Sequence, residues 1–146
     1  MNATPPSLAA DRPPAGACIL YDGECRLCSR GAARCAALLR RLGFALAPLQ
    51  SRWVATRLGA SPQALSQAVR LLMPDGRVLA GVDVFLEVMG AVPLLRPVVA
   101  LGYRPAIHRW LAAAYAVVAR NRFRIGGRCR CAPSDPRGAP GMDRSC

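Results

Sequence analysis

The sequence predicts an α/β fold in which one small mixed β-sheet is covered by helices. Short apolar runs that suit buried strands alternate with segments whose apolar residues recur every three or four positions. A Pro-Asp-Gly turn joins two of these apolar runs, which is typical of a hairpin. The chain has 146 residues, 53% of them hydrophobic, so it contains enough apolar material for one core.

The first predicted elements are a strand and the helix that follows it. The strand comprises residues 18–21, an apolar run that an Asp-Gly pair stops. The helix ends at Gly43, because glycine commonly follows the last helical turn. Its apolar stripe has spacings of three and four residues: Cys28, Ala32, Cys35, Leu39 and Leu42. We expect Cys35 in this stripe and Cys18 in the strand to be small buried residues.

The middle of the chain predicts a second strand, a short helix and a hairpin. The strand covers residues 44–49, and the helix begins at Ser51 and ends at Leu58. The hairpin strands lie within residues 68–73 and 77–80. Proline presets one dihedral angle of the connecting turn and glycine tolerates a positive one, so the turn sequence has a physical basis.

Two further helices are predicted in the last third of the chain. Asp83 is expected to cap the first helix, which runs to about Gly90. Pro105 suits the first turn of the second helix, which runs from Arg104 to about Arg120. The predicted order is therefore strand, helix, strand, helix, hairpin and helices.

This pattern predicts one domain at residues 17–128, between a flexible segment at 1–16 and an irregular tail at 129–146. The first sixteen residues do not have the pattern of a secretory signal. The most apolar later stretch, residues 88–101, is interrupted by prolines and an arginine and is shorter than the roughly 20 residues of a membrane-spanning helix. We therefore expect a cytoplasmic protein without a membrane span.

The net charge of +12 suggests an anionic partner, but the composition favours another explanation. All twenty basic residues are arginines in a chain rich in Ala, Gly and Pro, as a GC-rich genome would encode. We therefore expect no nucleic-acid partner. The densest arginine cluster is expected to be a solvated helix end and tail, with docking of an acidic partner as the alternative: Arg120, Arg122, Arg124, Arg128 and Arg130.

The chemistry is predicted from the cysteines. Seven is an odd number, and without a secretory signal a close pair is more often catalytic or metal-binding than a structural disulfide. Cys25 and Cys28 are separated by two residues at the start of a helix, whose partial positive charge and free amides favour a thiolate at Cys25. Cys28, one turn further in and expected to be more sheltered, can resolve the mixed disulfide that Cys25 forms with a substrate. Cys35 lies about 10 Å along the helix from Cys28, beyond disulfide reach.

The acidic residues beside this pair have two possible roles. Asp22 and Glu24 could transfer protons to and from the thiols, so Asp22 is a candidate catalytic residue. Alternatively, Asp22 organises the turn through a bond between its side chain and the backbone. His108 has no acidic neighbour in sequence and is expected to lie on a helix surface. Aromatic residues at helical positions are expected to pack in the core or at its rim: Trp53, Trp110, Tyr103 and Tyr115.

The residues around the cysteine pair resemble a known family. Tyr21-Asp22-Gly23-x-Cys25-x-x-Cys28 is similar to the signature of the DCC thiol-disulfide oxidoreductase family, whose members look like thioredoxin-fold proteins. The similarity extends over about residues 18–131 through further segments: Pro48-Leu49-Gln50, Asp75-Gly76-Arg77, Gly81-x-Asp83, and Tyr115-x-x-x-Ala119-Arg120-Asn121-Arg122-Phe123-Arg124-x-x-Gly127-Arg128. The resemblance implies a thioredoxin-like sandwich and a dithiol activity.

An oxidoreductase of this kind needs no bound organic cofactor. It would act on a thiol or disulfide of a protein or a small molecule, and an external redox partner would reset the pair. The dipeptide Arg26-Leu27 differs from the Gly-Pro of thioredoxins proper, so their reduction potential does not transfer to this chain. No proline directly precedes Ala68, where thioredoxins place a cis-proline before the third strand.

The C-terminal cysteines leave an alternative function open. Cys129 and Cys131 could be resolving or regulatory thiols, or simply accessible thiols in a tail. If they converged with Cys25 and Cys28, four thiolates would form a tetrahedral zinc site and the chain would be a metal-binding module. Cys146 at the terminus is expected to take no part.

Overall fold

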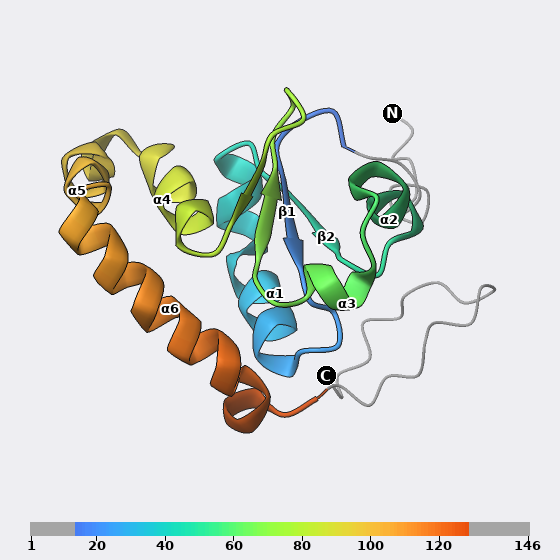
Figure 1. The fold of residues 1–146 in the computed structure, drawn as a ribbon. Helices are drawn as coiled ribbons and strands as arrows, with labels where there is room; N and C mark the ends of the chain where they lie inside the picture. Colours follow the sequence, from blue (N-terminus) through green and yellow to red (C-terminus); the bar gives the residue numbers. More distant parts are fainter. Residues whose placement is uncertain (1–13, 129–146) are drawn as a thin grey trace.

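The computed structural model describes residues 14–128. It has a four-stranded mixed sheet flanked by helices, so the predicted α/β class is confirmed (Figure 1). Most of the predicted flexible segment at 1–16 lies outside the described residues. The whole predicted tail at 129–146, with its three cysteines, also lies outside them. The predicted domain boundaries therefore stay predictions.

The sheet has the strand order β2-β1-β3-β4. Its strands are β1 (Cys18–Tyr21), β2 (Ala45–Pro48), β3 (Arg70–Leu72) and β4 (Val78–Ala80). Strand β1 pairs in parallel with β2 and antiparallel with β3, and Ile19 lies opposite Leu46 and Leu71. Strands β3 and β4 are antiparallel, which confirms the hairpin predicted from the Pro-Asp-Gly turn. The helix between β1 and β2 makes the crossover that a parallel pair requires.

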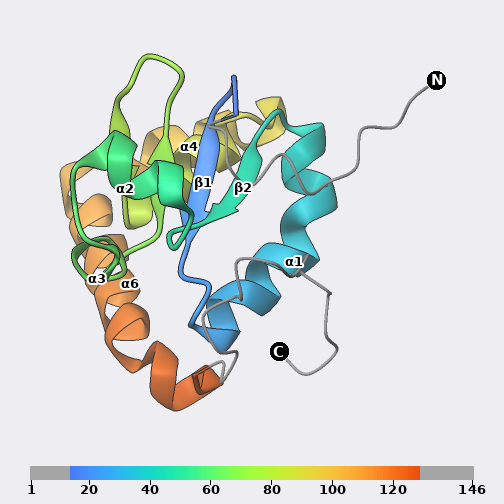
Figure 2. The same cartoon turned by 90° about the vertical axis from the view of Figure 1, so that its right-hand side faces the viewer.

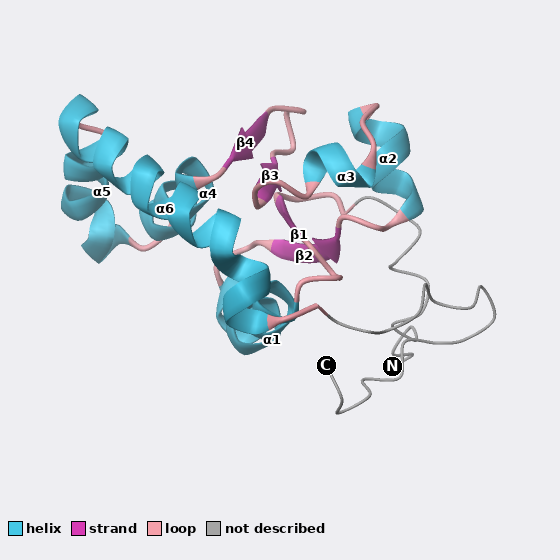
Figure 3. Cartoon of the chain, turned by 60° about the horizontal axis from the view of Figure 1, so that its bottom comes forward, coloured by secondary structure: helices cyan, strands magenta, loops and turns pink. Residues whose placement is uncertain are grey.

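Helices cover both faces of this sheet (Figures 2 and 3). The described helices are α1 (Arg26–Arg41), α2 (Arg52–Leu58), α3 (Pro62–Leu65), α4 (Val82–Gly90), the 3-10 helix η2 (Pro93–Leu95), α5 (Arg96–Gly102) and α6 (Pro105–Gly126). Helices α2 and α3 lie against one face, and α1 and α4 against the other. Helix α6 runs along the outside of the molecule from α5 to the N-terminal end of α1 (Figure 1).

Alternation along β1 creates a separate apolar cluster on each face of the sheet. Cys18 and Leu20 pack with buried residues of α2, α3, β3 and the loop after β2: Leu49, Trp53, Val54, Leu65 and Leu72. Ile19 points to the opposite face and packs with residues of α1, β3, α4 and the loop before β2: Leu39, Phe44, Leu71 and Val84. The predictions that Cys18 and Trp53 are buried are confirmed.

Some predicted boundaries are wrong for identifiable reasons. Gly81, with φ +64°, occupies the position before α4, so Asp83 lies in the first turn and does not cap the helix. Helix α6 continues to Gly126, past the predicted end at Arg120, because its last turn packs against α1. Residues 88–101, which prolines interrupt, contain most of helix α5. Pro97 lies in the first turn of this helix, where a backbone N–H would have no partner within the helix, so no hydrogen bond is lost.

Two predictions of buried side chains are also wrong. Cys35 is exposed, although it shares the inner stripe of α1 with Leu39, which is buried in the core. The sheet covers this helix face near its C-terminal end and leaves the middle of the face in solvent. Trp110 is 79% exposed on α6 and does not pack in the core or at its rim. None of the helices within residues 14–128 is both long and apolar enough to cross a membrane.

Candidate active site

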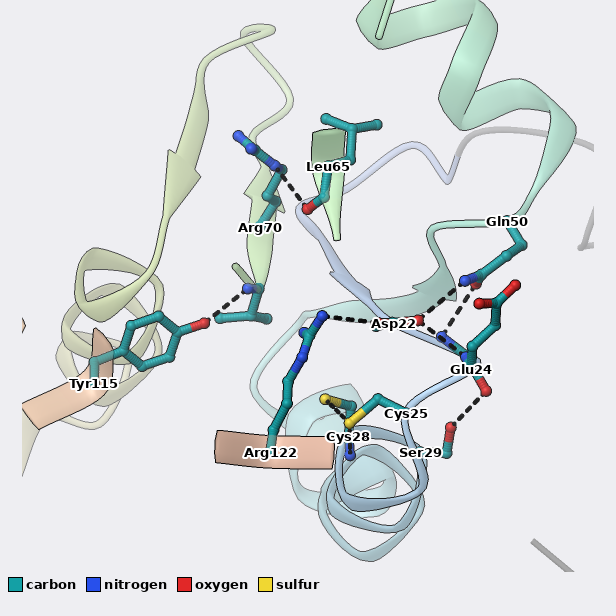
Figure 4. Close-up of polar contacts among 12 residues, drawn as sticks. Asp22, Glu24, Cys25, Cys28, Ser29, Gln50, Leu65, Arg70, Tyr115 and Arg122 are labelled. Carbon is teal, nitrogen blue, oxygen red and sulfur yellow. Dashed lines mark hydrogen bonds and ion pairs between the residues drawn. The ribbon is translucent and has the colours of Figure 1, made fainter. Parts of the chain in front are cut away.

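The structure brings Cys25 and Cys28 together at the start of α1. Cys25 is the N-cap residue, and the Cys28 amide donates a hydrogen bond to Cys25 Sγ over 3.3 Å. The Cys28 thiol also donates to Cys25 Sγ, and the two sulfur atoms lie 2.8 Å apart (Figure 4). Both residues are free cysteines. Two donors therefore converge on Cys25 Sγ.

The burial of the pair is the reverse of the sequence prediction. Cys25 is 0% exposed, whereas Cys28 is only partly buried. The chain beyond α6 returns over the start of α1, where Arg128 pairs with Cys25 in an antiparallel bridge. The Arg26 amide donates to the Gly127 carbonyl over 3.3 Å. Residues 127–128 therefore lie against the first cysteine, a contact between segments about a hundred positions apart.

The electrostatic surroundings favour the protonated form of Cys28. Its pKa is raised from 9.0 to about 12. Burial is the largest cause, followed by the hydrogen bond to Cys25 and by the charge of Cys25. The charge of Arg122 lowers this pKa and the charge of Asp22 raises it, and both effects are smaller. Cys28 is consequently a thiol at neutral pH, which is the form that donates its proton toward Cys25.

A buried ion pair lies beside the cysteines. Asp22 Oδ2 lies 3.0 Å from Arg122 Nη2, and both side chains are at most one-tenth exposed (Figure 4). Asp22 Oδ1 accepts hydrogen bonds from the Glu24 amide at 3.0 Å and from Gln50 Nε2 at 3.1 Å. The prediction that Arg122 is solvated is wrong, because it lies on the inner face of α6 and meets a buried carboxylate.

These contacts also fix the loop that precedes α1. Gln50 Oε1 accepts a hydrogen bond from the Gly23 amide at 3.1 Å, so one glutamine side chain binds both the loop backbone and Asp22. A Cβ atom at Gly23 would lie 2.8 Å from Gln50 Oε1, so a side chain at this position would displace the Gln50 amide from its hydrogen bonds. The Ser29 hydroxyl donates to the Gly23 carbonyl at 3.2 Å. Glu24 contributes its backbone amide to this network, while its side chain is exposed.

Gln50 and Arg122 belong to the site but were not predicted from the sequence. Local patterns cannot place them there, because they lie 28 and 100 positions from Asp22. The available signal was the family resemblance, since both residues fall in the segments that carry it. These segments come together around Asp22 in the fold.

A groove extends from the ion pair along α6. It has a volume of about 680 Å³, and its lining includes Arg122, Tyr115, His108 and Asp83. The Tyr115 hydroxyl accepts a hydrogen bond from the Val69 amide at 2.9 Å, which ties α6 to the start of β3, and burial raises the pKa of Tyr115. His108 Nε2 lies 2.8 Å from Asp83 Oδ1, so the acidic partner that the neighbouring sequence lacks comes from α4 in the folded chain.

The alternative zinc site needs residues beyond those described. Cys129 and Cys131 lie outside residues 14–128. Within that range, no group of three or more His, Cys, Asp and Glu side chains is arranged to hold a metal ion. The metal-binding module therefore stays a prediction.

Comparison with known proteins identifies the family. The search of curated proteins gave no match, and neither did the search of solved structures. The sequence model of the DCC1-like thiol-disulfide oxidoreductases matches residues 19–128, most of the chain and all of the site just described. The mixed sheet flanked by helices is consistent with the thioredoxin-like fold that the resemblance implies. The chain belongs to the DCC1-like thiol-disulfide oxidoreductase family.

Proposed function

We propose that this protein exchanges disulfides through Cys25 as the attacking sulfur and Cys28 as the resolving thiol. The observation that carries the proposal is the hydrogen bond from the Cys28 thiol to Cys25 Sγ. A thiol that donates in this way stabilises negative charge on the acceptor, and the raised pKa keeps Cys28 protonated in that role. The amide of Cys28 supplies a second donor to the same sulfur.

The reaction has two exchange steps. In the first, the Cys25 thiolate attacks a substrate disulfide, so that a bond forms between Cys25 and one substrate sulfur while the other substrate sulfur leaves. In the second, Cys28 loses its proton and attacks Cys25 Sγ, which releases the remaining substrate sulfur. The substrate gains two electrons and is released as two thiols, and the pair becomes a disulfide. An external dithiol then reduces the pair.

Access to Cys25 is part of this proposal. Because Cys25 is fully buried, a substrate disulfide reaches its sulfur only after neighbouring groups are displaced. Residues 127–128 are held there by an isolated bridge and a 3.3 Å hydrogen bond. Such an attachment is weaker than a full strand pair, so movement of this segment is the proposed route to the first cysteine.

Asp22 acts in the proposal as a positioning residue. Hydrogen bonds from Glu24 and Gln50 and the ion pair with Arg122 occupy its carboxylate, which supports the role of organising the loop. Its charge also raises the pKa of Cys28. In Asp22→Asn the pKa of Cys28 should therefore fall, and alkylation of Cys28 should accelerate at a lower pH than in the unaltered protein. An unchanged pH profile in a folded Asp22→Asn protein would remove this role.

The proposal is tested with cysteine variants of the full chain. We expect Cys25→Ser to lose exchange with a labelled disulfide peptide, because the attacking sulfur is absent. Cys28→Ser should accumulate a mixed disulfide at Cys25, detected by mass spectrometry, because attack proceeds without resolution. Cys35→Ser is the matched control, since Cys35 is exposed and lies further along the same helix.

The results of the three variants distinguish the proposed roles of Cys25 and Cys28 from the alternatives. Normal exchange in Cys35→Ser together with the two defects supports the assignment. A mixed disulfide that forms at Cys28 in the Cys25→Ser protein, with loss of exchange in Cys28→Ser, would reverse the two roles. Near-normal turnover in both variants would exclude the pair from the reaction.

A further inference from the structure

The outer face of α6 carries apolar side chains that no part of the described chain covers. Trp110, Val117, Val118 and Ile125 are all exposed, and Trp110 is 79% exposed. Trp110, Ala114, Val118, Asn121 and Ile125 follow one another at spacings of four, four, three and four, and Val117 lies beside them, so these residues form one row along the helix. The adjoining inner face of α6 supplies Tyr115 and Arg122 to the interior. The outer row is therefore not needed for packing within this domain.

A second exposed row lies on the neighbouring segment. Leu94 of η2 is 84% exposed, and Val98 and Leu101 of α5 follow it at spacings of four and three. Helix α5 contacts α6, and Figure 1 shows α5 beside the start of α6, which runs along one side of the molecule. Large exposed apolar surfaces on a folded chain commonly mark an interaction site.

The charge on this part of the chain has one sign. Residues 88–128 contain no Asp or Glu. They contain seven arginines: Arg96, Arg104, Arg109, Arg120, Arg122, Arg124 and Arg128. Arg122 pairs with Asp22 in the interior, whereas Arg109, Arg120 and Arg124 are exposed and flank one edge of the α6 row.

The exposed apolar rows and the arginines together favour one class of partner over the others. A second copy of the chain, packed on the same face, would place these arginines against each other, and like charges repel. A nucleic acid would pair with the arginines but would leave Trp110 and the aliphatic row unused. An anionic bilayer matches both features, because lipid phosphates accept from arginine while apolar side chains enter the boundary of the acyl chains.

We infer that the outer face of α5 and α6 binds the surface of anionic membranes. The helices lie in the plane of the interface, with Trp110 and the aliphatic row below the phosphates and the arginines at their level. This attachment is peripheral, because the helices lie on the bilayer surface and do not cross it. The inference goes beyond the exchange chemistry and is independent of it.

The test uses the full chain and two kinds of vesicle. One kind is an equal mixture of phosphatidylcholine and phosphatidylglycerol, and the other is phosphatidylcholine alone. We expect sedimentation with the anionic vesicles only, and binding that weakens as NaCl increases. Trp110 fluorescence should shift to the blue and become protected from quenching, whereas the buried Trp53 should change little. The shift should be absent in Trp110→Phe.

Variants of exposed residues locate the binding face. Trp110→Glu with Val117→Glu should weaken vesicle binding by about tenfold or more, because two inserted apolar groups become charged. Glutamine at Arg109, Arg120 and Arg124 should cost about fivefold for each arginine. The matched controls lie on α1, where Leu38 and Arg40 are also exposed: Leu38→Glu and Arg40→Gln should bind as the unaltered chain does.

Several results would overturn the inference. They include equal binding to both kinds of vesicle, absence of binding, or equal losses in the α1 controls. Binding of duplex DNA at least as tight as vesicle binding, unaffected by Trp110→Glu, would indicate a general polycation. A dimer in solution that Trp110→Glu dissociates would assign the face to a second copy. Circular dichroism shows that each variant is folded before its binding is scored.

Discussion

At the scale of single residues, the site combines what the local sequence predicts with what only distant residues supply. Cys25 and Cys28 were predicted as a pair because two intervening residues put both at the first turn of a helix. Asp22 was also a candidate, since it directly precedes this turn. Arg122 was assigned to the solvated surface, and its burial depends on a carboxylate that lies 100 positions away. A buried charge needs such a partner, and a single sequence does not say which partner it has.

Cys18 provides a prediction about stability at alkaline pH. Burial in the apolar cluster raises its pKa from 9.0 to about 11. In the unfolded chain the thiol ionises near its ordinary pKa, so between the two values the unfolded state loses a proton that the folded state keeps. The free energy of unfolding should therefore fall as the pH rises through this range, and Cys18 should contribute ~2 kcal/mol of the decrease.

The measurement is urea denaturation under reducing conditions, at neutral pH and near the raised pKa. Cys18→Ala should lose less stability than the unaltered protein over this interval, because it has no thiol to ionise. Cys35→Ala serves as the control, since that side chain is exposed. Identical pH dependence in all three proteins would contradict the burial of an un-ionised Cys18.

At the scale of elements, the approach of α6 to α1 assembles the site. Gly126 makes this approach possible, because a Cβ atom there would lie 2.7 Å from the Leu27 Cβ and 2.9 Å from the Leu27 amide nitrogen. The same contact places Arg122 one turn earlier on the inner face of α6, beside Asp22. The length of α6 was underestimated because this packing at its last turn has no counterpart in the local pattern.

Two glycines in these helices give a matched prediction. Gly126→Ala should destabilise the protein by ~1–3 kcal/mol, because the new methyl group meets backbone that rotation of a side chain cannot move. Gly31→Ala should stabilise it by ~1 kcal/mol, since Gly31 lies inside α1 with open space around it. Urea denaturation measures both changes. If Gly126→Ala stabilises the protein as Gly31→Ala does, the close approach of α6 is not the deciding interaction.

At the scale of the whole molecule, the sheet separates two apolar clusters. The net charge of the molecule is strongly positive. The net charge is +12, and the segment that forms α5 and α6 contributes arginines without any acidic residue. Self-repulsion of this kind disfavours the compact state. The buried pair of Asp22 and Arg122 is poorly accessible to salt, so the exposed arginines dominate the response to ionic strength.

Added NaCl should therefore raise the melting temperature. Salt screens the repulsion between the arginines, because the Debye length falls from about 10 Å at 0.1 M salt to about 3 Å at 1 M. Each 1 kcal/mol of relieved repulsion should raise the melting temperature by about 2–4 °C in a domain of this size. Thermal unfolding followed by circular dichroism measures the shift. A variant with glutamine at Arg109, Arg120 and Arg124 should respond less, and an equal response would show that these charges do not destabilise the fold.

The sequence by itself determined the α/β class, the hairpin and the placement of Cys25 and Cys28 at the start of a helix. These features depend on residues close together in the chain, where apolar spacing and turn residues act directly. Only the tertiary structure decided that residues 127–128 cover Cys25, that Arg122 is buried and that Cys35 is exposed. Each of these features depends on how segments far apart in the sequence pack against one another. The pattern of neighbouring residues does not predict which distant segments come into contact.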